Sequence, residues 1–186
     1  MNRLIPIIFS LLFFSSCKKN EQIQREYSIK NTKFNFEKLT TQKINKIESE
    51  NGGIQVRKPY KVTLGESYFP DVKNYEFEQP LIYLRDSANI KNAVSYFSTK
   101  KDNKVRVIEY SWSKPKDNDS IIVKIYENNI KIISRKLNQN GKITNETNDS
   151  WKQQIVSWEN DSIYIWSFIY SDDLPKRTRV IIRQKE

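Results

Sequence analysis

The stretch that decides the fold is Ile163-Tyr164-Ile165-Trp166-Ser167-Phe168-Ile169-Tyr170 (residues 163–170), in which aliphatic and aromatic side chains alternate. Successive side chains of a β-strand point to opposite faces of its sheet, so this pattern predicts a strand with isoleucines on one face and rings on the other. A strand that is apolar on both faces is usually central and covered on both sides. We therefore expect a sheet built around this segment.

The neighbouring segments extend this strand into a meander. Residues 153–158 and 177–184 are also rich in apolar and β-branched residues, and the polar residues 159–161 and 172–175 have the composition of turns. We therefore predict a C-terminal three-stranded meander in which residues 162–170 form the middle strand.

Symmetric turns set the register of this meander and place Tyr170 opposite Arg177 and Trp158 opposite Ile163. The isoleucine face then gains four apolar residues: Val156, Trp158, Val180 and Ile182. The opposite face gains Ile155 and Ile181, and it combines four rings with three arginines: Tyr164, Trp166, Phe168, Tyr170, Arg177, Arg179 and Arg183.

These four rings and three arginines, called the aromatic–arginine face below, form the candidate binding surface. A guanidinium over an aromatic ring gains about 0.5–1 kcal/mol at an exposed site and more when desolvated. Such a surface suits stacking on sugar rings and binding their acidic groups, or docking a protein partner. The alternative is structural: a helix covers the rings, and the arginines only fringe that contact.

Two other segments predict helices. Asn35 is a candidate N-cap for a helix over 36–50, which ends at Asn51-Gly52-Gly53. Asp119 is the candidate cap of a second helix, over 120–137, whose apolar residues recur every three to four positions. The high β-branched content of this second segment leaves a pair of strands as the alternative.

Further strand signals precede the second helix, at residues 54–64, 81–85, 93–98 and 105–112. A helix, strands, another helix and more strands indicate the α+β class with an antiparallel sheet. We expect a single domain over 34–186 with about five to seven strands and one or two packed helices.

The first seventeen residues carry an export signal. One positive charge at Arg3 precedes an apolar run from Leu4 to Phe14, and Ser15-Ser16 then precede Cys17, which is the only cysteine of the chain. An apolar run of this size is typical of a secretory signal and is too short to cross a bilayer. At Phe14-Ser15-Ser16-Cys17 the segment resembles a bacterial lipoprotein precursor, with Phe14 where that family usually has leucine.

This resemblance implies cleavage after residue 16, acylation (palmitate among the chains) of Cys17 and anchoring in the cell-envelope membrane. We expect a signal peptide at 1–16, a lipidated Cys17 with a polar tether at 17–33, and a fold that does not need residues 18–33. Lys18 stands where an aspartate usually retains lipoproteins at the inner membrane, so the outer membrane is expected, with its face left open. The alternative is a plain secretory signal with an unmodified cysteine.

Composition excludes several classes of site. The chain has 186 residues, 32 Lys+Arg against 22 Asp+Glu, and no histidine. Without histidine it lacks Ser-His-Asp triads and imidazole metal sites, and four glycines cannot form a dinucleotide loop. We expect no catalytic residue, metal or cofactor. The net charge of +10 suits an anionic glycan or an envelope protein rather than nucleic acid in this compartment, or charge dispersed for solubility.

Two weaker patterns remain. Glu76 and Glu78 alternate across Phe77, and paired carboxylates hydrolyse glycosides, although solvated edge charges have the same spacing. Three Asp-Ser-apolar triplets resemble a short bacterial O-glycosylation acceptor motif, and their serines are Ser87, Ser120 and Ser162. Asp-Ser pairs also suit turns and caps.

The sequence therefore predicts a lipid-anchored envelope protein that acts as a non-catalytic binding or interaction module. Two alternatives remain: a protective lipoprotein of the immunity type, which neutralises a toxin or hydrolase, and a carboxylate-based glycan hydrolase.

Overall fold

The computed structural model describes residues 29, 39–57, 64, 75–85, 90–113, 119–147, 152–171 and 177–185. Its helices and strands are, in chain order, α2 (Thr41–Glu50), β1 (Ile54–Gln55), β2 (Leu81–Leu84), β3 (Lys91–Ser98), β4 (Val105–Ser113), α3 (Asp119–Leu137), β5 (Lys142–Thr147), β6 (Lys152–Glu159), β7 (Ile163–Ser171) and β8 (Arg177–Gln184).

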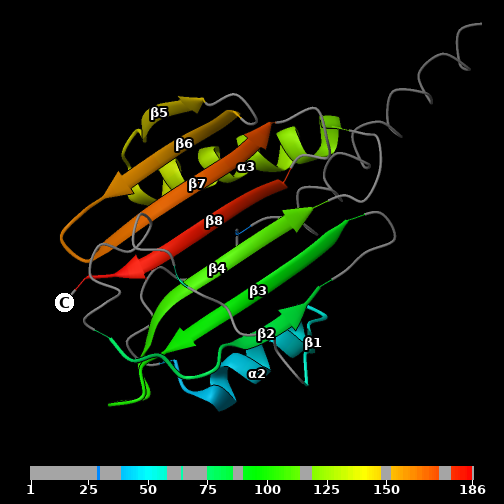
Figure 1. Cartoon of the computed structure of the whole chain (residues 1–186), viewed down its shortest axis with the longest axis vertical. Coiled ribbons are helices and arrows are strands. Elements are labelled where there is room, and N and C mark those ends of the chain that lie inside the picture. Colours follow the sequence, from blue (N-terminus) through cyan, green and yellow to red (C-terminus); the bar gives the residue numbers. More distant parts are fainter. Residues whose placement is uncertain are drawn as a thin grey trace, which may run out of the picture.

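All eight of these strands belong to one antiparallel sheet, with the order β1-β2-β3-β4-β8-β7-β6-β5 (Figure 1). The strands β1 to β4 form one half and β5 to β8 the other, and each half is a run of neighbours in sequence. The two halves meet where β4 pairs with β8, and this pairing makes β8 a central strand.

The expected number of strands is wrong. The sheet has eight strands rather than about five to seven, and the C-terminal meander has four strands rather than three, because β5 pairs with β6. The sequence of β5, Lys-Ile-Thr-Asn-Glu-Thr, has one large apolar residue, and all six side chains are exposed. A strand that buries no face carries no hydrophobic alternation, so its sequence pattern does not reveal it. The α+β class and the packing of helices on an antiparallel sheet are as expected.

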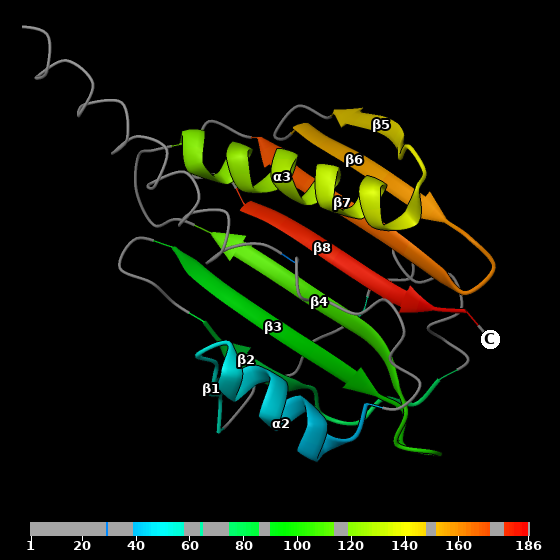
Figure 2. The ribbon, with the colours of Figure 1, turned by 180° about the vertical axis from the view of Figure 1, so that it is seen from behind.

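Both described helices lie on the same face of the sheet (Figure 2). Helix α3 confirms the helix expected over 120–137 and packs on β7 and β8. Two hydrogen bonds tie it to β6: Tyr126 Oη donates to Gln154 Oε1 at 3.1 Å, and Trp158 Nε1 donates to Ser134 Oγ at 3.2 Å. The isoleucines of α3 enter the main core with the isoleucine face of β7.

Helix α2 begins five residues later than expected. Its N-cap is Thr40, whose hydroxyl accepts from the backbone N–H of Lys43 at 3.3 Å, and the expected cap Asn35 lies outside the described residues. The helix ends where predicted: Gly52 has φ +72°, a left-handed conformation that glycine adopts without strain. The segment 54–64 contributes only Ile54–Gln55 to the described sheet.

The register of the meander matches the expectation on one side. Tyr170 lies opposite Arg177 and Phe168 opposite Arg179, as symmetric turns require. On the other side Trp158 lies opposite Ile165 rather than Ile163, because the turn between β6 and β7 is centred one residue later than expected, with Glu159 and Tyr164 as the last pair. A shift of two residues keeps every side chain on its face, so the predicted faces hold.

One residue of the expected tether belongs to the core. Ile29 is fully buried and joins the main cluster with Ile44 of α2 and Tyr96 of β3. The residues immediately before and after Ile29 lie outside the described part. At least this side chain of the segment 18–33 therefore contributes to the packed domain.

Candidate functional site

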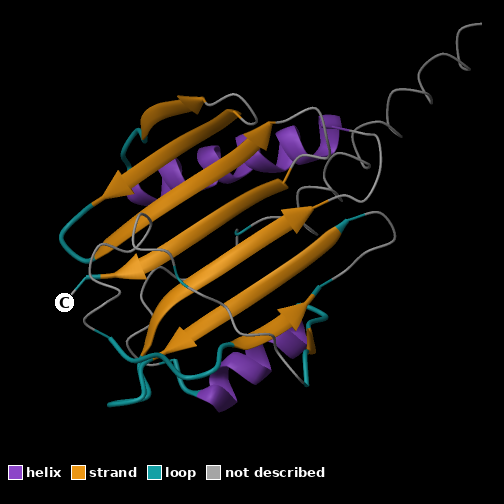
Figure 3. Cartoon of the chain, in the orientation of Figure 1, coloured by secondary structure: helices purple, strands orange, loops and turns teal. Residues whose placement is uncertain are grey.

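Figure 3 shows both described helices on one side of the sheet. Trp166, Phe168 and Tyr170 of the aromatic–arginine face belong to the second apolar cluster, separate from the main cluster that the helices join, so this face lies on the opposite side. Strand β7 carries its four rings and β8 its three arginines, and the pairing sets Tyr164 beside Arg183, Phe168 beside Arg179 and Tyr170 beside Arg177. The structure thus brings together all seven residues that the sequence selects. Among the described residues no helix covers the rings of this face. Instead Leu64 and Phe77, both outside helices, pack on the second apolar cluster that Phe97, Val107, Phe168 and Ile181 form on this face.

Exposure varies across this face. Phe168 is 1% exposed and Arg183 is 7% exposed, so these two residues are part of the interior. Tyr164, Trp166, Tyr170 and Arg179 are half-buried. The Arg177 side chain is 50% exposed and is the most accessible member of the set. The accessible part of the face therefore consists of half-buried rings and one exposed arginine, Arg177.

The rings stack on one another rather than lying open. Tyr164 and Trp166 are stacked with centroids 5.5 Å apart and planes 15° apart, and Phe168 and Tyr170 are stacked at 6.5 Å and 14°. Arg183 and Lys185 add cations over the Tyr164 ring, at 5.4 Å and 4.3 Å from its centroid. Because neighbours contact the flat faces of Tyr164, sugar stacking on that ring is disfavoured.

A buried glutamate organises the arginines. Glu109 of β4 lies on the same face, and its Oε1 accepts from Arg179 Nε at 2.8 Å, while Arg177 Nη2 is 3.8 Å away. Burial alone would lower the pKa of Arg179, but the Glu109 carboxylate and the Tyr170 hydroxyl raise this pKa above its ordinary value. Two arginines, Arg177 and Arg179, share this one glutamate, so this part of the face keeps a net positive charge.

Arg177 has a side-chain hydrogen bond and only a long ion pair. Its Nε donates to Ser111 Oγ at 3.1 Å, and its distance to Glu109 is at the long end for an ion pair. The Arg177 side chain is 50% exposed, and a guanidinium matches a carboxylate with two parallel hydrogen bonds. The arrangement is therefore suited to capturing an acidic group beside the Tyr170 ring.

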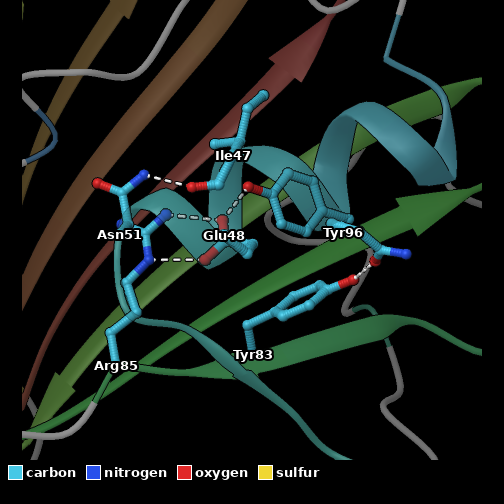
Figure 4. A network of polar contacts seen from close by, with 7 residues as sticks. Ile47, Glu48, Asn51, Tyr83, Arg85 and Tyr96 are labelled. Atoms are coloured by element: carbon cyan, nitrogen blue, oxygen red, sulfur yellow. Dashed lines mark hydrogen bonds and ion pairs between the residues drawn. The ribbon is translucent and has the colours of Figure 1, made fainter.

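A second polar cluster escaped the sequence analysis (Figure 4). Glu48 of α2 is fully buried, and it accepts from Arg85 Nε at 2.7 Å, from Arg85 Nη2 at 2.6 Å and from the Tyr96 hydroxyl. The neighbouring Tyr83 hydroxyl donates to Asn45 Oδ1. Burial, followed by the charge of Glu48, raises the pKa of Tyr83, so this phenol stays protonated. Glu48 lies four residues after the buried Ile44, and this spacing on one helix face was the available signal.

The role of the Glu48 cluster is structural. It joins α2 to β3 and to the end of β2, and its carboxylate accepts three hydrogen bonds. Because Glu48 is fully buried and paired with Arg85, it is not exposed to a ligand. Burial alone would lower the pKa of Arg85, but the paired Glu48 raises it, so the ion pair persists at neutral pH.

The other sequence candidates are dispersed. Glu76 and Glu78 are both exposed, and Glu76 pairs with Lys100 at 3.6 Å. Ser162 is exposed in the β6–β7 turn, where its N–H donates to Asn160 Oδ1 at 2.9 Å. Ser120 lies in the first turn of α3, and Ser87 and Cys17 lie outside the described residues.

Comparisons of the chain with protein-family models, with curated proteins and with solved structures find no match. Neither helix in the described part combines the length and the apolarity that crossing a membrane requires.

Proposed function

We propose that the protein is a lipid-anchored envelope protein that binds an acidic partner protein through the aromatic–arginine face. The observation that carries the binding role is Arg177, an exposed guanidinium beside Tyr170 that shares Glu109 with the more closely bound Arg179. Interfaces concentrate their binding energy in a few aromatic and arginine residues, and both types lie side by side here.

The stacking of the rings favours a protein partner over a glycan. Sugars bind aromatic platforms through the flat ring face, whereas Tyr164 has Trp166 and two cations against it. The half-buried rings and the exposed Arg177 guanidinium remain partly accessible, and such groups contact side chains and carboxylates in protein interfaces. A toxin or hydrolase with an acidic surface is one partner of this kind, which keeps the immunity-type role as a special case.

The anchoring part of the proposal rests on the sequence. The apolar run ending in Ser15-Ser16-Cys17 supports acylation of Cys17, and the polar residues that follow support a short tether. Several acyl chains give stable anchoring, since each buried CH₂ contributes about 0.8 kcal/mol. The outer membrane remains the expected address because Lys18 follows Cys17.

A glycan hydrolase is the less supported alternative. Among the described carboxylates, Glu48 and Glu109 are neutralised by arginines, and Glu76 and Glu78 are exposed. Hydrolysis needs two carboxyl groups that face one sugar, and no pair among these four is arranged so.

The binding role can be tested with defined anionic probes. Poly-L-glutamate represents an acidic protein surface, and polygalacturonate represents an anionic glycan. We expect binding of poly-L-glutamate to weaken about tenfold or more in Arg177→Glu and to fall with rising salt. Lys124→Glu, which makes the same charge change at an exposed position of α3, is the matched control and should bind like the wild type.

Equal losses in both variants would show only a dependence on net charge and would contradict a dedicated face. Tighter binding of polygalacturonate, lost in Arg177→Glu, would assign the face to a glycan instead.

Lipidation is tested separately by metabolic labelling with an alkynyl fatty acid: wild type should incorporate the label and Cys17→Ala should not. Unlabelled wild-type protein with a different mature N-terminus would refute the anchor alone.

A further inference from the structure

Strand β5 forms one edge of the sheet and is paired on one side only. β5 pairs with β6 on one side, and no described element lies beyond it on the other (Figure 1). All six of its side chains are exposed, including Ile143, an isoleucine that is 62% exposed. An edge strand leaves a row of backbone N–H and C=O groups available for pairing with another strand.

The start of β5 is held firmly in position. Gly141, the residue before it, passes so close to β6 that an added Cβ would lie 2.3 Å from Val156 Cγ1 and 2.6 Å from Trp158 Cε2. Both of these side chains are buried in the main core. The edge is therefore a fixed strand of the sheet rather than a loosely attached segment.

The charges of β5 are self-complementary. Lys142, Thr144 and Glu146 point to one face of the strand, because alternate residues share a face. In an antiparallel pair of two copies centred on Thr144, each Lys142 lies opposite the other copy's Glu146, and Ile143 lies opposite Asn145. Opposite charges in directly paired positions stabilise antiparallel strands. In the described part of the chain neither Lys142 nor Glu146 has an ion pair.

From this pattern we propose that two copies of the chain associate through antiparallel pairing of their β5 strands. The two-fold axis is perpendicular to the sheet and passes between the two Thr144 residues. The two eight-stranded sheets then join into one continuous sheet. This inference is independent of the binding role of the aromatic–arginine face, which lies on β7 and β8.

The geometry leaves room for both copies of α3. The axis keeps both helices on the same face, and α3 packs on β7 and β8. With strands about 4.8 Å apart, a helix above β7 and its symmetry mate are separated by about 24 Å, which exceeds a helix diameter of about 10–12 Å. Helix α3 therefore does not obstruct pairing at this edge.

The register can be tested by cysteine cross-linking in the full chain. Directly paired residues in antiparallel strands have Cα atoms about 4.5–5.5 Å apart, which is within reach of a disulfide. We expect mild oxidation to convert Thr144→Cys into a covalent dimer on a non-reducing gel. Wild type, which contains only Cys17, controls for that thiol, and Gln55→Cys on the opposite edge strand β1 controls for random collision.

Charge reversal provides the second test, with the Thr144→Cys cross-link as readout. Lys142→Glu alone and Glu146→Lys alone each replace two attractive pairs by two repulsive ones, so the dimer should weaken about tenfold or more. The double variant restores both pairs and should cross-link like the parent. Circular dichroism confirms that each variant is folded.

A folded Thr144→Cys chain that stays monomeric, or one that cross-links no faster than Gln55→Cys, would overturn the proposal. Failure of the double charge swap to restore cross-linking would overturn the register and with it the charge argument.

Discussion

Arg85 donates through Nε and Nη2 to both oxygens of Glu48, so the carboxylate that α2 buries completely is matched by a guanidinium from the end of β2. Together with the Tyr96 hydroxyl and the hydrogen bond from Tyr83 to Asn45, this pair attaches α2 to the sheet through polar contacts. Such a pair stabilises the fold only while both members are present, because an isolated charge in the interior is costly.

Removing one member of this pair should therefore be severe. We expect Arg85→Ala to lower the free energy of unfolding by about 3–5 kcal/mol, because it leaves Glu48 buried and unpaired. The double variant Glu48→Leu/Arg85→Leu should lose much less than the sum of its single changes. Urea denaturation measures this, and Lys46→Ala on the exposed side of α2 should change little. Additive losses would show that the two residues act separately.

Ile165 and Trp166 point to opposite faces of β7, so substitutions at these two positions test each face separately. Ile165 is fully buried, so Ile165→Ala should cost about 2–5 kcal/mol. Trp166 is half-buried, so Trp166→Ala should cost roughly 2 kcal/mol or less while weakening the capture of poly-L-glutamate. Thermal melts and binding titrations give the two readouts. A loss of stability from Trp166→Ala as large as for a buried tryptophan, with unchanged binding, would make this ring purely structural.

The burial of Ile29 revises the expectation that residues 18–33 are dispensable to the fold. A chain starting at residue 34 should melt at a lower temperature than one starting at 17, and Ile29→Ala should cost about 2–5 kcal/mol. Ile54→Ala makes the same change at a residue that is 74% exposed and should be nearly neutral. Identical melting temperatures for the two chain lengths would show that residues 18–33 do not stabilise the fold.

Asn129 is an unusual core residue of α3. It is fully buried, and among the described residues neither its Nδ2 nor its Oδ1 has a hydrogen-bond partner. An unsatisfied buried amide costs about 1–3 kcal/mol, so Asn129→Leu should raise the free energy of unfolding by an amount of that order. Asn128→Leu, at the neighbouring half-buried position, is the control. A strong destabilisation by Asn129→Leu would show that the amide has an essential partner.

Acid should weaken the turn between β3 and β4. The Thr99 hydroxyl and then the Lys104 N–H hold the pKa of Asp102 below its ordinary value of 3.8. A lowered pKa in the folded state adds stability that is complete above pH about 3.8 and is lost as the pH falls through the lower value. Asp102→Asn should therefore melt below wild type at neutral pH, and the difference should shrink below pH about 4. A pH-independent difference would assign the effect to packing.

The sequence predicted those parts of the fold that alternation controls. The alternation in 163–170 predicted β7 and both of its faces, and the short turn before Arg177 determined the pairing with Tyr170. Strand β5 was missed because all its side chains are exposed, so its sequence lacks the alternation of apolar and polar residues that indicates a strand. The start of α2 was misplaced because Asn35 and Thr40 are both capable caps, and only packing decides between them.

The candidate site divides in the same way. The aromatic–arginine face follows from period-two spacing within one meander, so its seven residues were found together. Glu109 and Glu48 were missed because their partners, Arg179 and Arg85, are distant in sequence. A charged residue inside an apolar pattern signals burial with a partner, but only the tertiary fold identifies that partner.

The central place of β8 has a consequence for biogenesis. Of the eight strands in the described sheet it is the last to be synthesised, and strands β1–β4 are joined to strands β5–β7 only through it. An emerging chain can form local hairpins, but the full sheet must wait for long-range closure, and contacts of this kind form slowly. Such a chain would stay unfolded for longer after synthesis, which is the state that a protein passing through a narrow translocation channel needs.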